Sequence, residues 1–156
     1  MDENFILLKV MHIFGAMLFL GNIIVSAVWK LMANRTREPV VVAFGQRLIS
    51  ITDYVFTVTG AAILVVTGHF MAARFGPIAD IDWIRWGWFL LIGSGTIWVF
   101  ILIPLQIMQS RMAEQFSQGG AIPARYWTLG RIWGAFGIIA TLLPMANLYI
   151  MVAKPV

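Results

Sequence analysis

The chain contains two histidines, His12 and His69, and no cysteine. An imidazole can carry a proton near neutral pH or bind a metal through either ring nitrogen. The lack of cysteine excludes disulfides, thiolate catalysis and zinc or iron–sulfur sites built on Cys. No Ser-His-Asp set, phosphate-binding loop or pair of carboxylates indicates a hydrolase or an NTPase. The chemistry of the two histidines therefore depends on the elements that carry them.

The composition indicates a membrane protein. Hydrophobic residues make up 60% of the 156 residues and charged residues only 12%, whereas soluble proteins have about 25% charged residues. Such an apolar excess would cover a soluble fold with exposed hydrophobic patches, which insertion into a bilayer avoids. The net charge of +4 does not indicate nucleic-acid binding, because the basic residues lie between apolar stretches.

Four apolar stretches are each long enough to cross a bilayer, which requires about 20 residues. They cover residues 5–29, 48–73, 86–108 and 132–153. None alternates in polarity as a barrel strand does, and helices are the other way to satisfy the backbone in lipid. The first stretch lacks the basic start of a signal peptide, so we expect it to be retained. We predict an all-α, polytopic membrane protein: an antiparallel bundle of four transmembrane helices in a single domain over residues 1–156.

Basic residues gather in the first and third connections between these stretches. They are Lys30, Arg35, Arg37 and Arg47 in the first, and Arg111, Arg125 and Arg131 in the third. The second connection balances two arginines with Asp80 and Asp82. The positive-inside rule then places the first and third connections in the cytoplasm. Both termini would face outward, which is the periplasm if the protein lies in a bacterial inner membrane.

This orientation places both histidines at one depth. His12 lies about seven residues into the first helix, and His69 lies about five to seven residues before the second helix ends, so both imidazoles are about 8–10 Å below the outer surface. Ionisable residues inside a membrane are costly and commonly functional. Two imidazoles at one level on adjacent helices suit axial ligation of a haem b. Small residues near them, such as Gly15 and Gly68, would leave room for the porphyrin.

Three basic residues at the same end are candidates to bind the haem propionates. They are Lys9, Arg74 and Arg85. Lys9 shares a helix face with His12, and charge-assisted hydrogen bonds to carboxylates are strong. Alternatively, these side chains snorkel to the lipid headgroups and anchor the helices.

Other interpretations of the histidines stay open. Each imidazole could hydrogen-bond a neighbouring helix instead of binding a metal. Two imidazoles are too few ligands for zinc. Copper(I) would need soft thioethers, which Met11, Met17 and Met71 could supply.

Two further features lie nearer the inner ends of the helices. Asp53 is expected to form an interfacial salt bridge rather than to act in a proton relay. Its candidate partners are Lys30, Arg47 and Arg131. Gly130 and Gly134 form a GxxxG motif, which would let the fourth helix approach a neighbour closely.

Four segments carry a resemblance: LKVMHIFGAMLFLGNIIVSAVWK, RLISITDYVFTVTG, TGHFMA and LYIMVAKP. Through them, most of this chain resembles a family of small bacterial membrane proteins of unknown function. The chain also resembles, more distantly, the HemJ-like protoporphyrinogen oxidases, through His12 and the Lys154-Pro155 ending. That resemblance implies a membrane protein that binds haem b and oxidises protoporphyrinogen. Those oxidases have a functional lysine in the third helix, where this chain has Arg85 within DWIRWGW. The resemblance therefore extends only to haem binding through His12.

These observations predict a haem b-binding membrane protein with a redox role, ligated by His12 and His69. Two histidine ligands fill both axial positions, which favours electron transfer over oxygen chemistry. The candidate partners are the lipid bilayer, a quinone, a porphyrinogen, a redox protein and a second copy of the chain. One alternative is a HemJ-like oxidase. The other is a non-redox transporter subunit or assembly factor, with Asn22, Asp53 and Asn147 at a dimer interface.

Overall fold

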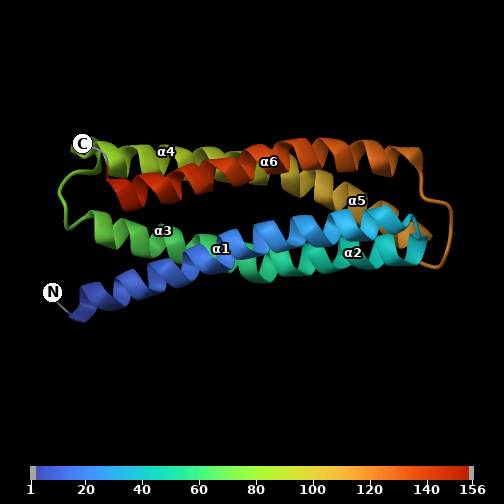
Figure 1. The fold of residues 1–156 in the computed structure, drawn as a ribbon, viewed down its shortest axis with the longest axis horizontal. Coiled ribbons are helices and arrows are strands. Elements are labelled where there is room, and N and C mark those ends of the chain that lie inside the picture. The colour runs from blue at the N-terminus through green and yellow to red at the C-terminus, as the bar shows by residue number, and fades with distance from the viewer. Residues whose placement is uncertain (1–2, 155–156) are drawn as a thin grey trace.

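The computed structural model describes residues 3–154 and contains four long helices, each antiparallel to the helix before it (Figure 1). The first is α1 (Glu3–Thr36). The second consists of α2 (Pro39–Thr52), the π-helical turn η1 (Asp53–Thr57) and α3 (Val58–Ala72). After the short 3-10 helix η2 (Ile78–Asp80), the third consists of α4 (Asp82–Ile97), the π-helical turn η3 (Trp98–Leu102) and α5 (Ile103–Phe116). The fourth is α6 (Ala124–Ala153).

All four helices are long and apolar enough to cross a membrane, which confirms the predicted four-helix membrane fold. The helices extend beyond the predicted membrane spans at several ends. The second helix begins at Pro39, before the span predicted from residue 48, and the third covers 82–116, beyond the predicted 86–108. Apolar stretches end at the first polar residues, whereas a helix continues until its backbone is interrupted. Pro39 suits a helix start, because the first turn needs no N–H partner there.

The helices form two closely packed pairs, α1 with α3 and α4 with α6 (Figure 1). Glycines allow α1 and α3 to touch: a Cβ on Gly60 would lie 2.7 Å from the backbone nitrogen of Phe19. A Cβ on Gly15 would lie 2.8 Å from Cγ2 of Ile63. The expectation that Gly15 leaves room for a porphyrin is therefore wrong, because α3 fills that space.

The two pairs join at the end of the bundle that carries the 37–38 and 117–123 connections. At η3 the Ile103 N–H bonds the Trp98 carbonyl in a widened turn, and such turns redirect a helix. Beyond it, α5 crosses from the layer of α4 and α6 to pack on α2 (Figure 1). A buried apolar cluster fixes this junction. It consists of Val42, Ala43, Ala113, Phe116 and Tyr126.

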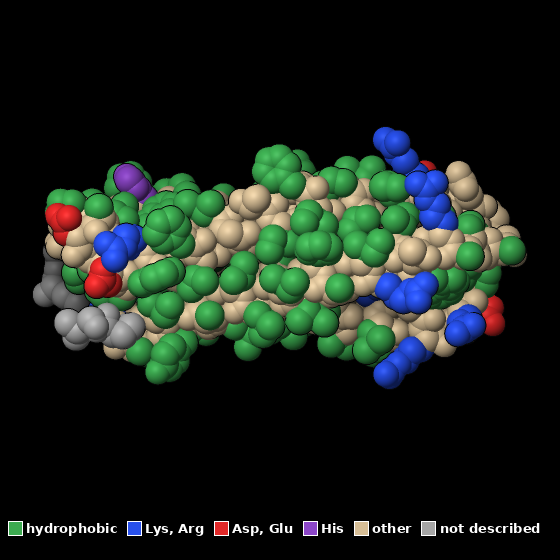
Figure 2. Space-filling model, turned by 90° about the horizontal axis from the view of Figure 1, so that it is seen from above, with side chains coloured by type: hydrophobic (Ala, Val, Ile, Leu, Met, Phe, Trp, Pro, Cys, Tyr) green, Lys and Arg blue, Asp and Glu red, His purple; other side chains and the backbone are tan. Residues whose placement is uncertain are grey.

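The outer surface of the bundle is apolar along its middle, and most of the visible basic side chains gather at the junction end (Figure 2). The buried face of α1 is instead partly polar, because it carries Asn22, Ser26 and Lys30. An apolar exterior around a partly polar interior suits a helix surrounded by lipid. The polar interior marks where a functional site should be sought.

Candidate functional site

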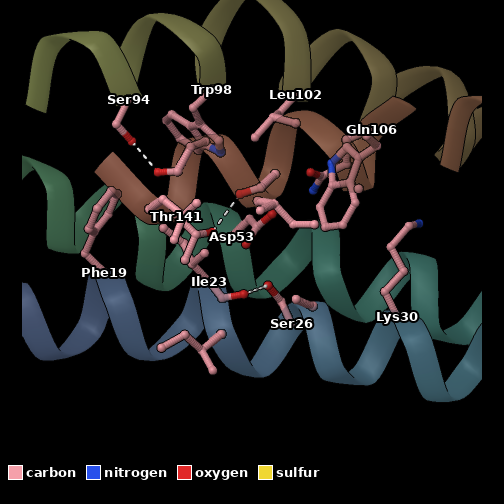
Figure 3. Close-up of a pocket in the computed structure, with 18 of the residues that line it drawn as sticks. Phe19, Ile23, Ser26, Lys30, Asp53, Ser94, Trp98, Leu102, Gln106 and Thr141 are labelled. Atoms are coloured by element: carbon pink, nitrogen blue, oxygen red, sulfur yellow. Dashed lines mark hydrogen bonds between the residues drawn. The ribbon is translucent and has the colours of Figure 1, made fainter. Parts of the chain in front are cut away.

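A cavity of about 760 Å³ lies between the two helix pairs. Its wall includes Phe19 and Ile23 of α1, Trp98 and Leu102 of η3, and Thr141 of α6 (Figure 3). The wall is mostly apolar, and its charged and amide side chains are Lys30, Asn34, Asp53 and Gln106. At the other end, the hydroxyls of Ser94 and Thr141 bond backbone carbonyls (Figure 3). Small-molecule sites commonly have about 300–1,000 Å³ and this balance of apolar wall and few polar groups.

The cavity opens sideways, toward the space that lipid would occupy. Ile24 and Val28 of α1 line it, as do Ile138 and Leu142 of α6, and all four are also exposed on the outside of the bundle. These two helices belong to different pairs, so the opening lies between the pairs. An apolar molecule dissolved in the bilayer could enter here without crossing water.

Glycines of α6 keep the cavity open. Gly134 and Gly137 line it, and a Cβ added to either would meet no atom within 4 Å. A Cβ on Gly130 would lie 3.1 Å from Nε2 of Gln109. The GxxxG prediction of close helix approach is therefore wrong at Gly134, where the missing side chain provides volume rather than contact.

Asp53 lies in the cavity wall at η1 and is 8% exposed. The Asn22 amide donates to Asp53 Oδ1 at 2.8 Å, and the Thr57 hydroxyl donates to the same oxygen at 3.3 Å. Asn22 also donates to Thr57 Oγ1 at 2.9 Å, which joins η1 to α1. Neutral donors from two helices thus replace water around the carboxylate.

The predicted salt bridge of Asp53 is wrong. Within residues 3–154, no ion pair joins Asp53 to Lys30, Arg47 or Arg131. Arg47 precedes Asp53 by about 9 Å along the helix, toward the junction end. The carboxylate therefore lies deeper than the nearest arginine of its own helix and takes its hydrogen bonds from Asn22 instead.

Lys30 lies at the polar end of the cavity and is only 5% exposed. Its ammonium donates to Gln46 Oε1, which also accepts the Tyr126 hydroxyl at 3.3 Å. The Lys30 nitrogen lies 5.1 Å from the ring centre of Trp133 and 5.5 Å from that of Tyr126. In the described part of the chain, no carboxylate forms an ion pair with Lys30.

A second cavity of about 270 Å³ adjoins this polar end. It shares Asn34 and Gly130 with the large cavity and is also lined by Arg37 and Arg131. Trp133 lines the large cavity, and its indole nitrogen is buried and has no hydrogen-bond partner among the described residues. We call this second space the basic vestibule.

The histidines lie toward the other end of the bundle and line neither cavity. His12 Nδ1 lies 2.9 Å from the hydroxyl of Thr67, and that hydroxyl donates to the Ile63 carbonyl at 2.6 Å. Since a hydroxyl has only one proton to donate, the His12 Nδ1–H is the donor to Thr67. The other ring nitrogen, Nε2, is then left as an acceptor.

His69 lies at the same level but has different neighbours. The His12 ring lies against Gly68, with its Cε1 atom 3.1 Å from where a Cβ would be. The expectation that Gly68 leaves space for a porphyrin is therefore wrong, because the His12 ring occupies that space. His69 is exposed, and its ring packs edge-on against Trp88 of α4 with 6.4 Å between ring centres.

The three predicted propionate partners are at the same end as the histidines. Arg85 pairs with Asp82 and donates to the Ala79 carbonyl at 2.9 Å. The Arg74 guanidinium lies 5.3 Å from the ring centre of Phe5, and Lys9 is exposed. Within residues 3–154, no cluster of three or more His, Cys, Asp or Glu side chains could hold a metal ion.

The sequence indicated Asn22, Lys30 and Asp53 as separate polar residues within or near the spans, but not that they line one cavity. Asn22, Ser26 and Lys30 recur every four residues along α1, a spacing that places them on one helix face. Gly15 and Phe19 continue that face. A polar stripe on an otherwise apolar helix was therefore the available signal.

The residues proposed for a dimer interface are used inside the chain. Asn22 and Asp53 bond each other, and the Asn147 amide donates to the Gly87 carbonyl at 3.1 Å. This arrangement does not support a subunit interface built from these three polar groups.

The fold defines a four-helix integral membrane protein with a largely apolar cavity between its two helix pairs. The chain belongs to the family described as predicted integral membrane protein (DUF2269), whose model matches residues 6–155. This match confirms the resemblance to a membrane protein family of unknown function. No curated protein and no solved structure matches the chain.

Proposed function

We propose that this protein binds an amphiphilic small molecule that enters the large cavity from the bilayer. The observation that carries the proposal is the cavity itself, which is apolar, opens between α1 and α6, and has Lys30 and Asp53 in its wall. An apolar body would lie among Phe19, Trp98 and Leu102, and a polar head would face the junction end (Figure 3).

Physical reasons favour occupation of this cavity. Side chains that border an empty space lose their dispersion contacts on that side. A lipid-soluble molecule restores these contacts and, since it comes from the membrane, pays little desolvation for its apolar part. Inward-facing polar groups in a membrane are costly, and a head group that hydrogen-bonds them offsets that cost.

Photolabelling in vesicles tests the proposal. The probe is a 16-carbon alkyl chain that carries a diazirine and ends in either an alcohol or a carboxylate. We expect label on α1 and α6 at the cavity mouth, near Val28 and Ile138, that excess unlabelled compound removes. If excess unlabelled compound removes none of the label, and the outward-facing Tyr149 and Val152 are labelled as strongly as the cavity mouth, the protein has no such site.

The distribution of charge also supports an orientation. We propose a bacterial inner membrane location with both termini in the periplasm, since basic side chains gather at the opposite end (Figure 2). The polar end of the cavity and the basic vestibule then face the cytoplasmic leaflet. A ligand head would therefore lie at the inner surface and its apolar body nearer the bilayer centre.

A haem-dependent redox role is a second candidate, favoured by the orientation of His12. A ligating histidine commonly donates its other ring N–H to an acceptor, and Thr67 is such an acceptor for Nδ1. His12 would then offer Nε2 to the iron of a haem b, with His69 as the other ligand, and the haem would supply one-electron redox chemistry. Purified protein from haem-replete cells should show a Soret band that His12→Ala abolishes. A spectrum without that band, or one unchanged in His12→Ala and His69→Ala, removes this candidate.

A HemJ-like oxidase would also use His12 as a haem ligand, but it must in addition turn over protoporphyrinogen. It predicts protoporphyrinogen oxidation in membranes, lost in His12→Ala. Membranes that contain the protein but oxidise no protoporphyrinogen would contradict it.

A further inference from the structure

We infer that the ligand of the large cavity is an anionic amphiphile, whose carboxylate or phosphate head binds between Lys30 and the basic vestibule. The inference rests on the proposed function and names the class of molecule that the same cavity accepts. Three independent features of the polar end lead to it: an ammonium that forms no ion pair among the described residues, an indole N–H without an acceptor there, and two arginines just beyond them.

The first feature is the charge of Lys30. This side chain is 5% exposed, and its direct contacts are an amide oxygen and two aromatic rings. Asp53 attracts Lys30 electrostatically from a distance, but its carboxylate is held by Asn22 and Thr57 and forms no ion pair with Lys30 in the described structure. A buried charge without a direct partner is unfavourable. An anionic head beside Lys30 would supply a direct ion pair.

The second feature is an excess of hydrogen-bond donors. The Lys30 ammonium has three N–H groups, and the structure records one hydrogen bond for them, to Gln46. The Trp133 indole N–H is buried without an acceptor in the described structure. Ionised carboxylates and phosphates accept several hydrogen bonds and donate none or few, so they match this set. A neutral alcohol could satisfy only part of it.

The third feature is the basic vestibule. Arg37 and Arg131 line it, and Asn34 and Gly130 connect it to the cavity. Arginine forms strong, often two-pronged hydrogen bonds with carboxylates and phosphates. The positive charge therefore continues from Lys30 toward the junction end, where the headgroups of the membrane would lie. Among residues 3–154, no acidic side chain lines the vestibule.

The apolar part of the ligand follows from the length of the cavity. The wall extends along α1 from Lys30 back to Phe19, which is about 16 Å along the helix axis. This distance holds much of a fatty acyl chain. The glycines at 134 and 137 of α6 leave the volume beside it free.

Competition binding tests the head-group chemistry. The assay measures displacement of the diazirine probe from protein in vesicles of neutral lipid. The competitors have the same 16-carbon chain and differ in the head group: hexadecanoic acid, hexadecyl phosphate and hexadecanol. We expect the two anions to bind at least tenfold more tightly than the alcohol. Lys30→Met should weaken the binding of the two anions at least tenfold and leave the binding of the alcohol unchanged. Arg125 is an exposed basic residue outside both cavities, so Arg125→Met should alter the binding of neither class.

Trp133→Phe provides a second variant that keeps the ring and removes only the N–H. We expect a loss of about threefold to tenfold for the anions, as for one hydrogen bond, even if Lys30→Met does not fold. Equal affinity of acid and alcohol, with no effect of Trp133→Phe, would overturn the anionic ligand and leave the proposed function standing. If inorganic phosphate displaced the probe as effectively as hexadecyl phosphate, the inference that the ligand is an amphiphile would be overturned. Absence of any saturable binding would overturn both proposals.

Discussion

At the scale of single residues, the bundle keeps its polar side chains inside and provides each with specific partners. Asp53 is the clearest case, because Asn22 and Thr57 both donate to one of its oxygens. The sequence predicted that Asp53 lies within the membrane but not which partner it has. A salt bridge and an amide hydrogen bond both satisfy a carboxylate, and only the packing of η1 against α1 decides between them.

Removal of the Asn22 amide tests this contact. Asn22→Leu should destabilise the protein by about 1–3 kcal/mol, because it removes one of the donors to the buried Asp53 and the donor to the buried Thr57 hydroxyl. Asn147→Leu is the matched control, since Asn147 makes one hydrogen bond, to the backbone of Gly87. It should cost about 0.6 kcal/mol, a typical value for a membrane hydrogen bond. Thermal unfolding in detergent measures both, and equal losses would contradict the role of Asn22.

At the scale of helices, hydropathy predicted the four elements but not how they pack. The spans follow from length and apolarity, which depend on each segment alone. The two helix pairs depend on long-range contacts, such as Gly15 and Gly60 between α1 and α3, and on the widened turn at Trp98–Leu102. The sequence therefore could not show that α6 uses its glycines for a cavity and that α1 uses its own for contact.

Alanine substitutions distinguish these two uses of glycine. Gly60→Ala should destabilise the bundle by about 1–3 kcal/mol, because its Cβ would meet the backbone of α1 and the tight packing cannot adjust. Gly137→Ala should be neutral or stabilising by up to about 1 kcal/mol, since alanine favours a helix and its Cβ enters open space. The unfolding temperatures in one detergent test both, and a loss in Gly137→Ala as large as in Gly60→Ala would contradict the packing.

At the scale of the whole molecule, the ends of the bundle differ in charge, and the proposed orientation of the cavity rests on this difference. The charge difference follows from loop composition, so the sequence could predict it. The cavity could not be predicted, because it exists only where the two helix pairs separate. The histidines illustrate the same limit: their chain positions indicated one level, but the neighbours of each ring depend on the packing of α1, α3 and α4.

Single cysteines test the orientation, since the natural chain has none. Gln118→Cys lies in the connection before α6, and Ile78→Cys lies in the connection before α4. In intact cells whose outer membrane is permeable to the reagent, an impermeant maleimide should label Ile78→Cys at once and Gln118→Cys only after lysis. The reverse pattern would place the polar end of the cavity at the outer leaflet.

Filling the space between the helix pairs tests whether it is a binding site. Gly137→Leu would place a side chain in the cavity, because Gly137 lines the cavity and a Cβ there meets no atom within 4 Å. Gly21→Leu is the matched control, since a Cβ at Gly21 also meets open space but Gly21 does not line the cavity. Both proteins should fold, and competition for the diazirine probe should show at least tenfold weaker binding in Gly137→Leu and unchanged binding in Gly21→Leu. Equal affinity in the two variants would show that the ligand does not bind in this cavity.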